Sequence, residues 1–266
     1  MSLKQHTSRD ERFRQQYLNS QDYLIPFLEE VLPIKSDMKI MEIGAAEGGV
    51  LKAFTDRNCW VFGVDLNPKR IEVAQGMMAE EVEAGKADFL AVNVYDEDFG
   101  KEWAGKFDLI LLKDTIEHIP EQEKFIPYIK RFLKPEGKIY FGFPPWRMPF
   151  GGHQQICRNK WLSKIPYYHL LPRGIYKAML KAGKEPEKVV TELLEIKDTG
   201  ISLARFERII KASDMQILNK RLYLFNPIYR FKFNIKPREQ YKLLGSIPYF
   251  RDFVTTAGWY VVGPNG

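Results

Sequence analysis

The sequence predicts an α/β fold in which helices cover both faces of a mainly parallel, doubly wound sheet. Short apolar runs alternate with longer helix-like segments along most of the chain, which is the order that produces parallel sheets. One of them, Ile40–Leu51, passes from an apolar run through an acid and several small residues into a helix-like segment. With 266 residues, 45% of them hydrophobic, the chain can bury one large core.

The expected elements follow this order along the chain. A helical arm over residues 9–32 carries a partial apolar stripe at helical spacing. The expected strands are 39–43, 60–64, 89–92, 107–112, 137–142, 216–225 and 253–262. The expected helices are 48–56, 68–82, 121–132 and 202–212, and Lys134–Gly137 is a stop signal for the third of them.

The turn after the first strand is suited to hold a ligand. Gly44 and Gly48 have no Cβ and Ala46 has only a methyl group, so a ligand can lie against the backbone. The helix that follows offers unpaired N–H groups at its start. The pattern indicates a nucleotide-like ligand.

Two acids narrow the choice of ligand. Asp65 ends the second strand, where a carboxylate can accept both ribose hydroxyls of any nucleotide cofactor, including a dinucleotide. Glu42 stands directly before the turn, where its charge would repel a phosphate but suits a ligand with an ammonium and a sulfonium. S-Adenosylmethionine carries both charges. A dinucleotide-dependent oxidoreductase is the alternative.

Five segments in order resemble motifs of the class I S-adenosylmethionine-dependent methyltransferases, particularly the small-molecule and lipid group that includes ubiquinone-biosynthesis enzymes. They are Glu42–Gly48, Gly63–Asn67, Phe107–Leu112, Asp114–Pro120 and Leu133–Ile139. The resemblance covers about 36–145 and resumes over 201–262. It implies a seven-stranded sheet with an antiparallel last strand, S-adenosyl-L-methionine as cofactor and S-adenosyl-L-homocysteine as product.

The resemblance also implies where the cofactor is bound. Glu42 and the turn backbone would face its methionine part, and Asp65 its ribose. Asn93, after the third strand, would contact the adenine amino group, with Asp96 as the rival candidate. The full set of expected cofactor residues is Glu42, Gly44, Ala45, Ala46, Gly48, Asp65, Leu66, Asn93, Val94, Lys113, Asp114 and Thr115.

The chain is expected to divide into three parts. These are an N-terminal helical arm (1–35), a cofactor-binding domain (36–145 and 201–266) and an inserted lid or substrate region (146–200). The insertion is far longer than the usual connection of about 2–6 residues, and long connections beside a cofactor site commonly shape a substrate pocket.

Positive charge is concentrated in one region. Residues 145–250 contain twenty Lys or Arg and eight Asp or Glu. These cations are scattered, with no run of five, which disfavours nucleic acid as a partner. The segment Trp161–Arg173 mixes apolar bulk with positive charge, which suits an anionic, partly apolar acceptor or peripheral contact with a membrane surface. A lid with a solvated basic face is the plainer alternative.

Two histidines are candidates for catalysis. A hydroxyl acceptor must lose its proton when it is methylated, and imidazole is the natural base at neutral pH. His153, in a glycine-bearing loop after the fifth strand, is the predicted general base or acceptor ligand. His118 is the second candidate, and a structural role in the turn before Pro120 is its alternative. His153 and Cys157 lack two further ligands at suitable spacing, so no metal site is expected.

The expected function is methyl transfer from S-adenosylmethionine to a small-molecule or lipid-linked acceptor, at oxygen. Glycan or glycolipid intermediates and quinone-like phenols are both open as acceptors. No apolar run reaches the ~18 residues of a membrane span, and two cysteines make no disulfide framework, so we expect no integral membrane segment and a cytoplasmic location. A catalytically silent, cofactor-binding partner subunit is a further alternative.

Overall fold

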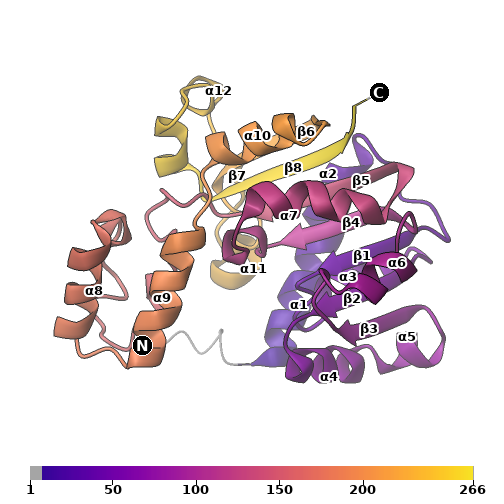
Figure 1. Ribbon diagram of the computed structural model, residues 1–266, viewed down its shortest axis with the longest axis horizontal. Coiled ribbons are helices and arrows are strands. Elements are labelled where there is room, and N and C mark those ends of the chain that lie inside the picture. The colour runs from indigo at the N-terminus through magenta and orange to yellow at the C-terminus, as the bar shows by residue number, and fades with distance from the viewer. Residues whose placement is uncertain (1–7, 266) are drawn as a thin grey trace.

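The structure is a computed structural model that describes residues 8–265, so His6 lies outside the described residues. Its centre is one eight-stranded sheet with the order β3-β2-β1-β4-β5-β8-β6-β7 (Figure 1). The strands are β1 (Lys39–Ile43), β2 (Trp60–Asp65), β3 (Ala87–Ala91), β4 (Phe107–Lys113), β5 (Leu133–Phe143), β6 (Met215–Phe225), β7 (Arg238–Glu239) and β8 (Ala257–Pro264).

The strand directions confirm a doubly wound sheet with an antiparallel last strand. Strands β1 to β5 pair in parallel, and β8 lies antiparallel between β5 and β6. The expected number of seven strands was wrong by one. The additional strand, β7, has two residues at the edge beside β6, too few to show the alternation by which a strand is recognised. Strand β8 begins at Ala257, because residues 250–254 form a 3-10 turn.

Helices cover both faces of this sheet. They are α1 (Arg9–Asn19), α2 (Ile25–Glu29), α3 (Gly49–Thr55), α4 (Pro68–Met77), α5 (Ala79–Glu83), α6 (Glu97–Glu102), α7 (Gln122–Ile129), α8 (Arg173–Ala182), α9 (Glu187–Thr199), α10 (Leu203–Ala212), α11 (Tyr229–Phe233) and α12 (Lys242–Gly245). The single helix expected over 68–82 is interrupted at Met78, whose φ of −116° is not helical.

The sheet separates two apolar cores. Along β4, Leu109 and Leu111 belong to one core, whereas Ile110 and Leu112 belong to the other, as expected of a strand covered on both faces. Helices α6, α7 and α10 pack on the second of these cores, and α2, α3 and α4 pack on the first. Since the strand interiors are apolar, polar groups that could meet a ligand are confined to the strand ends.

The N-terminal arm packs directly on α3. A Cβ added to Gly49, the first residue of α3, would lie 2.4 Å from the carbonyl oxygen of Phe13 in α1. Tyr17 donates a hydrogen bond of 2.9 Å to Asp56 Oδ2 at the end of the same helix. The arm therefore reaches the helix that follows the small-residue turn.

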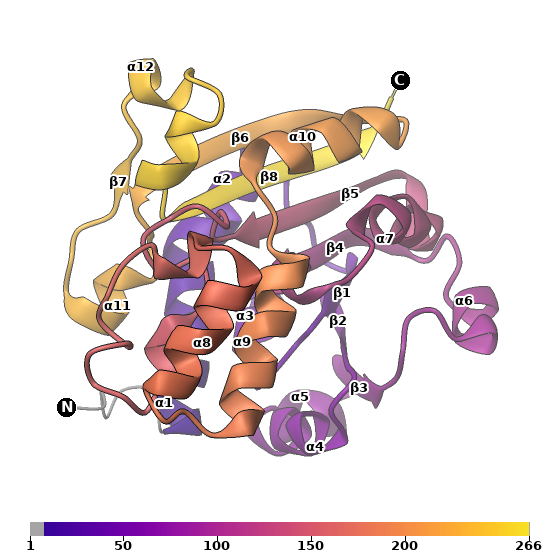
Figure 2. The ribbon, with the colours of Figure 1, turned by 60° about the vertical axis from the view of Figure 1, so that its left-hand side comes forward.

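Residues 146–200 form a helical hairpin with its own apolar cluster. Tyr176 and Leu180 of α8 are buried against Val190 and Leu193 of α9. Figure 1 and Figure 2 show this hairpin, α11 and α12 on the side of the molecule to which the parallel strand β4 points. Among the described residues, no helix is both long enough and apolar enough to cross a membrane.

Candidate active site

The turn after β1 has a backbone conformation that favours small residues. Gly44 and Gly48 have φ values of +80° and +82°, and Ala46 has +48°, in the left-handed region that a Cβ disfavours. A Cβ on Gly44 would also lie 2.6 Å from Thr115 Oγ1. The missing side chain thus allows the loop after β4 to close against the turn, which brings together two segments of the expected cofactor site.

Glu42 is a buried acid at the end of β1. It is 2% exposed, and its Oε2 has no hydrogen-bond partner. Burial raises the pKa of Glu42 well above its usual value, and Asp114 and Asp65 act in the same direction, against the ammonium of Lys113. Because an unpaired buried carboxyl is unfavourable, a cationic donor in the adjoining cavity would stabilise it.

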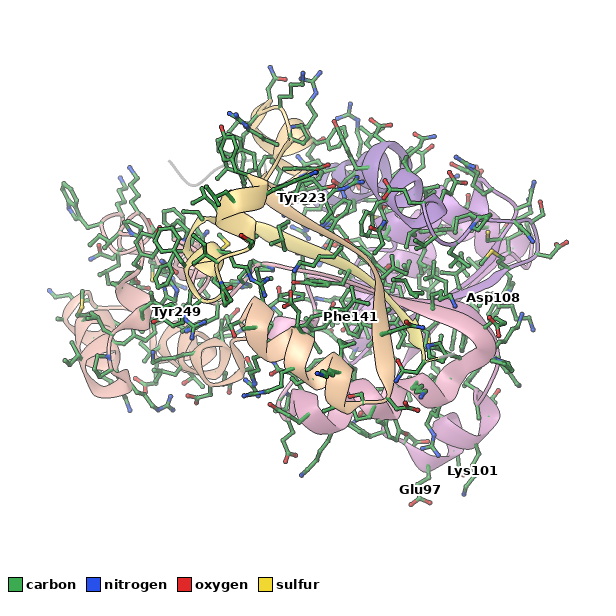
Figure 3. The ribbon with its side chains drawn as sticks, turned by 90° about the horizontal axis from the view of Figure 1, so that it is seen from above. Glu97, Lys101, Asp108, Phe141, Tyr223 and Tyr249 are labelled. Atoms are coloured by element: carbon green, nitrogen blue, oxygen red, sulfur yellow. The ribbon has the colours of Figure 1, made fainter. Side chains whose placement is uncertain are left out.

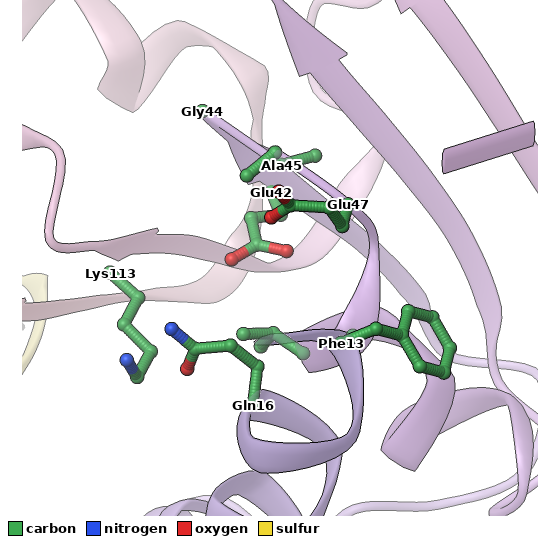
Figure 4. Close-up of a pocket in the computed structure, with 10 residues that line it drawn as sticks. Phe13, Gln16, Glu42, Gly44, Ala45, Glu47 and Lys113 are labelled. Carbon is green, nitrogen blue, oxygen red and sulfur yellow. The ribbon is translucent and has the colours of Figure 1, made fainter. Parts of the chain in front are cut away.

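The cavity next to Glu42 is closed on its other side by the N-terminal arm (Figure 4). It has a volume of about 50 Å³, and its lining includes Phe13 and Gln16 of α1 as well as Lys113. Sequence reasoning placed no site residue in the arm. The apolar stripe of the arm predicts a helix but does not indicate which element that helix packs on. Arg12 forms an ion pair with Glu47 in the turn.

Asp65 is a second buried acid, at the end of β2. Its Oδ1 accepts a hydrogen bond of 2.9 Å from the N–H of Asn67, whereas Oδ2 accepts none and lies 3.6 Å from Arg70 Nη1. A larger cavity of about 560 Å³ lies along Asn67 and Arg70 and shares Ala46 with the first cavity. This volume is typical of small-molecule sites. Leu66 is 74% exposed.

The residues expected near adenine are held in a short turn after β3. Asn93 Oδ1 accepts from the N–H of Tyr95 at 3.1 Å. Asp96 caps α6, with Oδ1 accepting from the N–H of Phe99 at 3.0 Å. The side chain of Val94 is buried in the core and lines neither cavity. Both rival adenine ligands thus hold the local backbone, Asn93 in the turn and Asp96 at the start of α6.

The loop after β4 places charges of both signs beside the turn. Lys113 is buried, and its Nζ donates to Asp114 Oδ2 at 2.9 Å. Burial favours the neutral form of Asp114, but Lys113, Lys232 and His153 outweigh it and lower the pKa of this carboxyl. Lys232 lies on α11. Sequence reasoning missed it because it belongs to a long connection without a recognisable motif.

The two candidate histidines meet at this loop. The ring centroids of His118 and His153 are 5.0 Å apart, at an interplanar angle of 73°. Burial lowers the pKa of His153 to about 4, with His118 acting in the same direction. Burial also lowers the pKa of His118. Both shifts favour the neutral imidazole, whose unprotonated ring nitrogen can accept a hydrogen bond.

A buried carboxyl adjoins this pair of imidazoles. Neither oxygen of Glu117 has a hydrogen-bond partner, and its Oε1 lies 4.0 Å from His118 Nε2. Burial, assisted by Asp114, raises the pKa of Glu117 well above its usual value. One ligand atom each from Glu117, His118 and His153 lies within 4.8 Å of the others. This set offers donors for a divalent cation that the sequence spacing did not indicate.

Cys157 and His169, which lie further along the insertion than His153, have partners of their own. Cys157 Sγ lies 3.4 Å from the hydroxyl of Tyr168 in the apolar cluster of the hairpin. His169 is fully buried, with Nε2 2.8 Å from the carbonyl oxygen of Trp146 and Nδ1 3.4 Å from Gln154 Nε2. The carbonyl requires a proton on Nε2, which leaves Nδ1 as acceptor. The structure thus separates Cys157 from the imidazole pair.

Comparison with known sequences identifies a family. The methyltransferase-domain family matches residues 12–171, more than half of the chain. A ubiquinone biosynthesis O-methyltransferase of Chromobacterium violaceum is 28% identical over 125 residues, covering 43% of this chain and 52% of the relative. A chloroplastic tocopherol O-methyltransferase of Arabidopsis thaliana is 28% identical over 155 residues, covering 52% of this chain and 43% of the relative. The chain thus matches about half the length of these curated relatives.

Comparison with solved structures agrees on the fold. Geranyl diphosphate C-methyltransferase of Streptomyces coelicolor, solved with S-adenosyl-L-homocysteine, has a TM-score of 0.56 at 14% identity and is covered over 80% of its length by 91% of this chain. At this identity the likeness concerns the fold alone. The family match, together with the order of the motifs and the strand topology, establishes that the chain belongs to the class I S-adenosylmethionine-dependent methyltransferases.

Proposed function

We propose that the protein transfers a methyl group from S-adenosylmethionine to a hydroxyl of a small-molecule or lipid-linked acceptor. The observation that carries the proposal is a pair of orphaned oxygens. Glu42 Oε2 and Asp65 Oδ2 are buried without hydrogen-bond partners at the ends of neighbouring strands. Buried polar atoms are nearly always satisfied, so the two acids fit a ligand with donors at both positions.

The cofactor would be held by the turn and the two acids. Glu42 would accept from its ammonium group, Asp65 from its ribose hydroxyls, and the backbone of Gly44–Gly48 would lie along its chain. Asn93 would face the adenine. When bound, S-adenosylmethionine supplies an electrophilic methyl group. Phe13 and Gln16 would cover the methionine end and keep water away from it, because both already line that cavity.

The acceptor proton would be taken up by the imidazole pair. His153 is neutral at physiological pH because burial lowers its pKa to about 4, and His118 stands beside it. A positioned general base contributes about 10²–10⁴-fold to a rate when its pKa lies near the operating pH, and the Asp114 carboxylate raises the pKa of His153 against the effect of burial. Lys113 and Lys232 lower the pKa of Asp114. This carboxylate would therefore stay ionised and orient the imidazoles. In this proposal residues 146–200 serve as the lid that brings His153 to the acceptor.

The relatives favour oxygen as the methylated atom. The ubiquinone biosynthesis and tocopherol enzymes are both O-methyltransferases. The chemistry of the site agrees, since an acceptor hydroxyl needs a proton acceptor and two neutral imidazoles are at hand. An acceptor with a lipid part would suit the apolar and basic surroundings of the insertion.

Two measurements test the proposal. Isothermal titration with S-adenosylhomocysteine and with NADH should show near-micromolar binding of the first alone. Labelled S-adenosylmethionine incubated with fractionated metabolites and lipids should then transfer its methyl group to one fraction, with mass spectrometry identifying the product. Binding without transfer to any fraction would favour the silent partner subunit, and binding of NADH alone would overturn the assignment of the cofactor.

A further inference from the structure

Large apolar side chains are exposed mainly in the basic region of the chain. Trp161 is 81% exposed, Leu243 77% and Tyr249 59%. Most of the other exposed large apolar side chains among the described residues also lie between residues 145 and 250. Single exposed apolar residues need no explanation, but a concentration of them usually marks an interaction site.

Contacts link these side chains across segments that are distant in the chain, and α12, which carries Leu243, contacts the 3-10 turn over 250–254. The N–H of Ile165 donates to the carbonyl oxygen of Trp161 at 3.1 Å, so both belong to one turn. Tyr167, two residues after Ile165, donates a hydrogen bond from its hydroxyl to the Phe253 carbonyl at 3.2 Å, and the Phe253 ring centroid lies 5.6 Å from that of Tyr249. Figure 3 shows Tyr249 beside the helices of the insertion, at the end of the molecule opposite Asp108.

Cations surround this surface and are largely free of acidic partners. Residues 158–188 contain eight Lys or Arg against two acids. Within that segment, the ion pairs among described residues are Arg173 with Asp198 and Lys181 with Glu187. Lys160 and Lys164 are exposed on either side of Trp161 and make no ion pair with a described residue. Lys242 is exposed next to Leu243.

We propose that this surface docks the protein onto membranes that contain anionic lipids. Its apolar members, named here the docking surface, are Trp161, Ile165, Tyr167, Leu243, Ile247 and Tyr249. Aromatic and aliphatic side chains enter the headgroup boundary while neighbouring lysines are drawn to anionic lipid. Trp and Tyr suit this boundary because each has an apolar body and a polar tip.

The composition argues for a bilayer over a protein partner. Interfaces between proteins are depleted in lysine, whereas here unpaired lysines alternate with the apolar residues. The position of the docking surface next to the His153 loop also fits the proposed function, and this part of the argument rests on that function. The loop that carries His153 is tied to the docking surface by the hydrogen bond of 2.8 Å from the Tyr167 N–H to the Pro149 carbonyl. A lipid-linked acceptor could therefore pass from the bilayer to the imidazole pair.

Vesicle co-sedimentation of the full chain tests the inference. We expect binding to vesicles of phosphatidylcholine with phosphatidylglycerol, and at least about tenfold weaker binding to phosphatidylcholine alone or in high salt. The double variant Trp161→Ser, Leu243→Ser should lower the partition coefficient by about tenfold or more. Lys160→Gln with Lys164→Gln should lower it by about tenfold.

Matched variants serve as controls. Leu90→Ser removes an exposed apolar side chain on β3, at the other edge of the sheet, and Lys101→Gln removes an exposed lysine on α6. Both should bind vesicles like the wild type. Equal binding of the docking-surface variants, or no sedimentation with anionic vesicles, would overturn the inference. The inference would also be overturned if the protein does not bind vesicles but self-associates in sedimentation velocity. Binding of S-adenosylhomocysteine, measured in parallel, reports separately on the proposed function.

Discussion

The strand ends that form the cofactor cavities and the basic region around the insertion use charge in opposite ways. Glu42 and Asp65, at the ends of β1 and β2, and Glu117, in the 3-10 turn after β4, are buried with oxygens that have no hydrogen-bond partner among the described residues. In the basic region, lysines and large apolar side chains are exposed to solvent. Buried carboxyl oxygens without hydrogen-bond partners suit a small ligand that supplies donors. Exposed lysines among large apolar side chains suit contact with an extended surface. In the two proposals, one chain carries two kinds of recognition, and the loop of His153 is hydrogen-bonded to the proposed docking surface through Tyr167 and Pro149.

The largest expected effect concerns the loop of His153. His153→Gln should lower kcat for methyl transfer by about 10²–10⁴-fold, because the acceptor proton loses its base, while binding of S-adenosylhomocysteine is unchanged. Initial rates with the labelled-cofactor assay measure it. His169→Gln, which changes a buried imidazole that contacts the Trp146 carbonyl and Gln154, is the control. Full turnover by the His153 variant with bound cofactor would show that His153 is not the base that takes the acceptor proton.

The second effect concerns the strand ends alone. Asp65→Asn should weaken binding of S-adenosylhomocysteine by about tenfold to a hundredfold, the usual contribution of a charged hydrogen bond. Titration calorimetry measures it. Asp96→Asn is the matched control, because Asn keeps the N-cap of α6. Unaltered affinity in the Asp65 variant would contradict the ribose assignment, and a loss in the Asp96 variant would move the adenine contact to that residue.

The third effect concerns the insertion alone. Burial lowers the pKa of His169 to about 4, below the unfolded value of about 6.5. Below pH 6.5 the unfolded chain therefore binds more protons, and stability falls as the pH is lowered toward 4. Between pH 7 and 5 this group should account for about 2 kcal/mol of lost stability. Urea unfolding at both pH values should show a smaller loss for His169→Gln, and equal losses would refute the prediction.

The smallest effect is a proton released at Glu42. Burial raises the pKa of this carboxyl, which shifts it toward its protonated form when no cofactor is bound. A bound ammonium favours the carboxylate, so binding should release up to about one proton and strengthen as the pH rises. Calorimetry in buffers of different ionisation enthalpy detects the release. Glu42→Gln should abolish it, and an unchanged buffer dependence in that variant would assign the proton to another group.

The elements that the sequence predicted well are those whose signals are local. Buried strands appear as short apolar runs, and Glu42, Gly44 and Asp65 follow from their position at strand ends. Helix α4 was found from the proline after its cap at Asn67, but its end was placed too late because a single glycine, Gly76, is a weak signal for the break at Met78. Strand β7 was missed because it is too short to alternate.

The remaining parts of the site depend on how distant segments meet. Phe13 and Gln16 line the first cavity only because α1 crosses α3. The approach of His118 to His153 depends on the path of the chain after β5, and the influence of Lys232 on Asp114 depends on where α11 packs. Helical periodicity identifies a face but not its neighbour, so no spacing within the chain could reveal these contacts.

The close approach of Gly49 to the Phe13 carbonyl has a consequence for shortened forms of the protein. Since Phe13 and Gln16 supply one wall of the cavity beside Glu42, a fragment that starts at residue 36 would leave Glu42 open to water. Its carboxyl would then regain an ordinary acidity, and the crevice would lose its preference for a cationic guest. The leading helix is better regarded as part of the receptor for the methyl donor than as a dispensable extension.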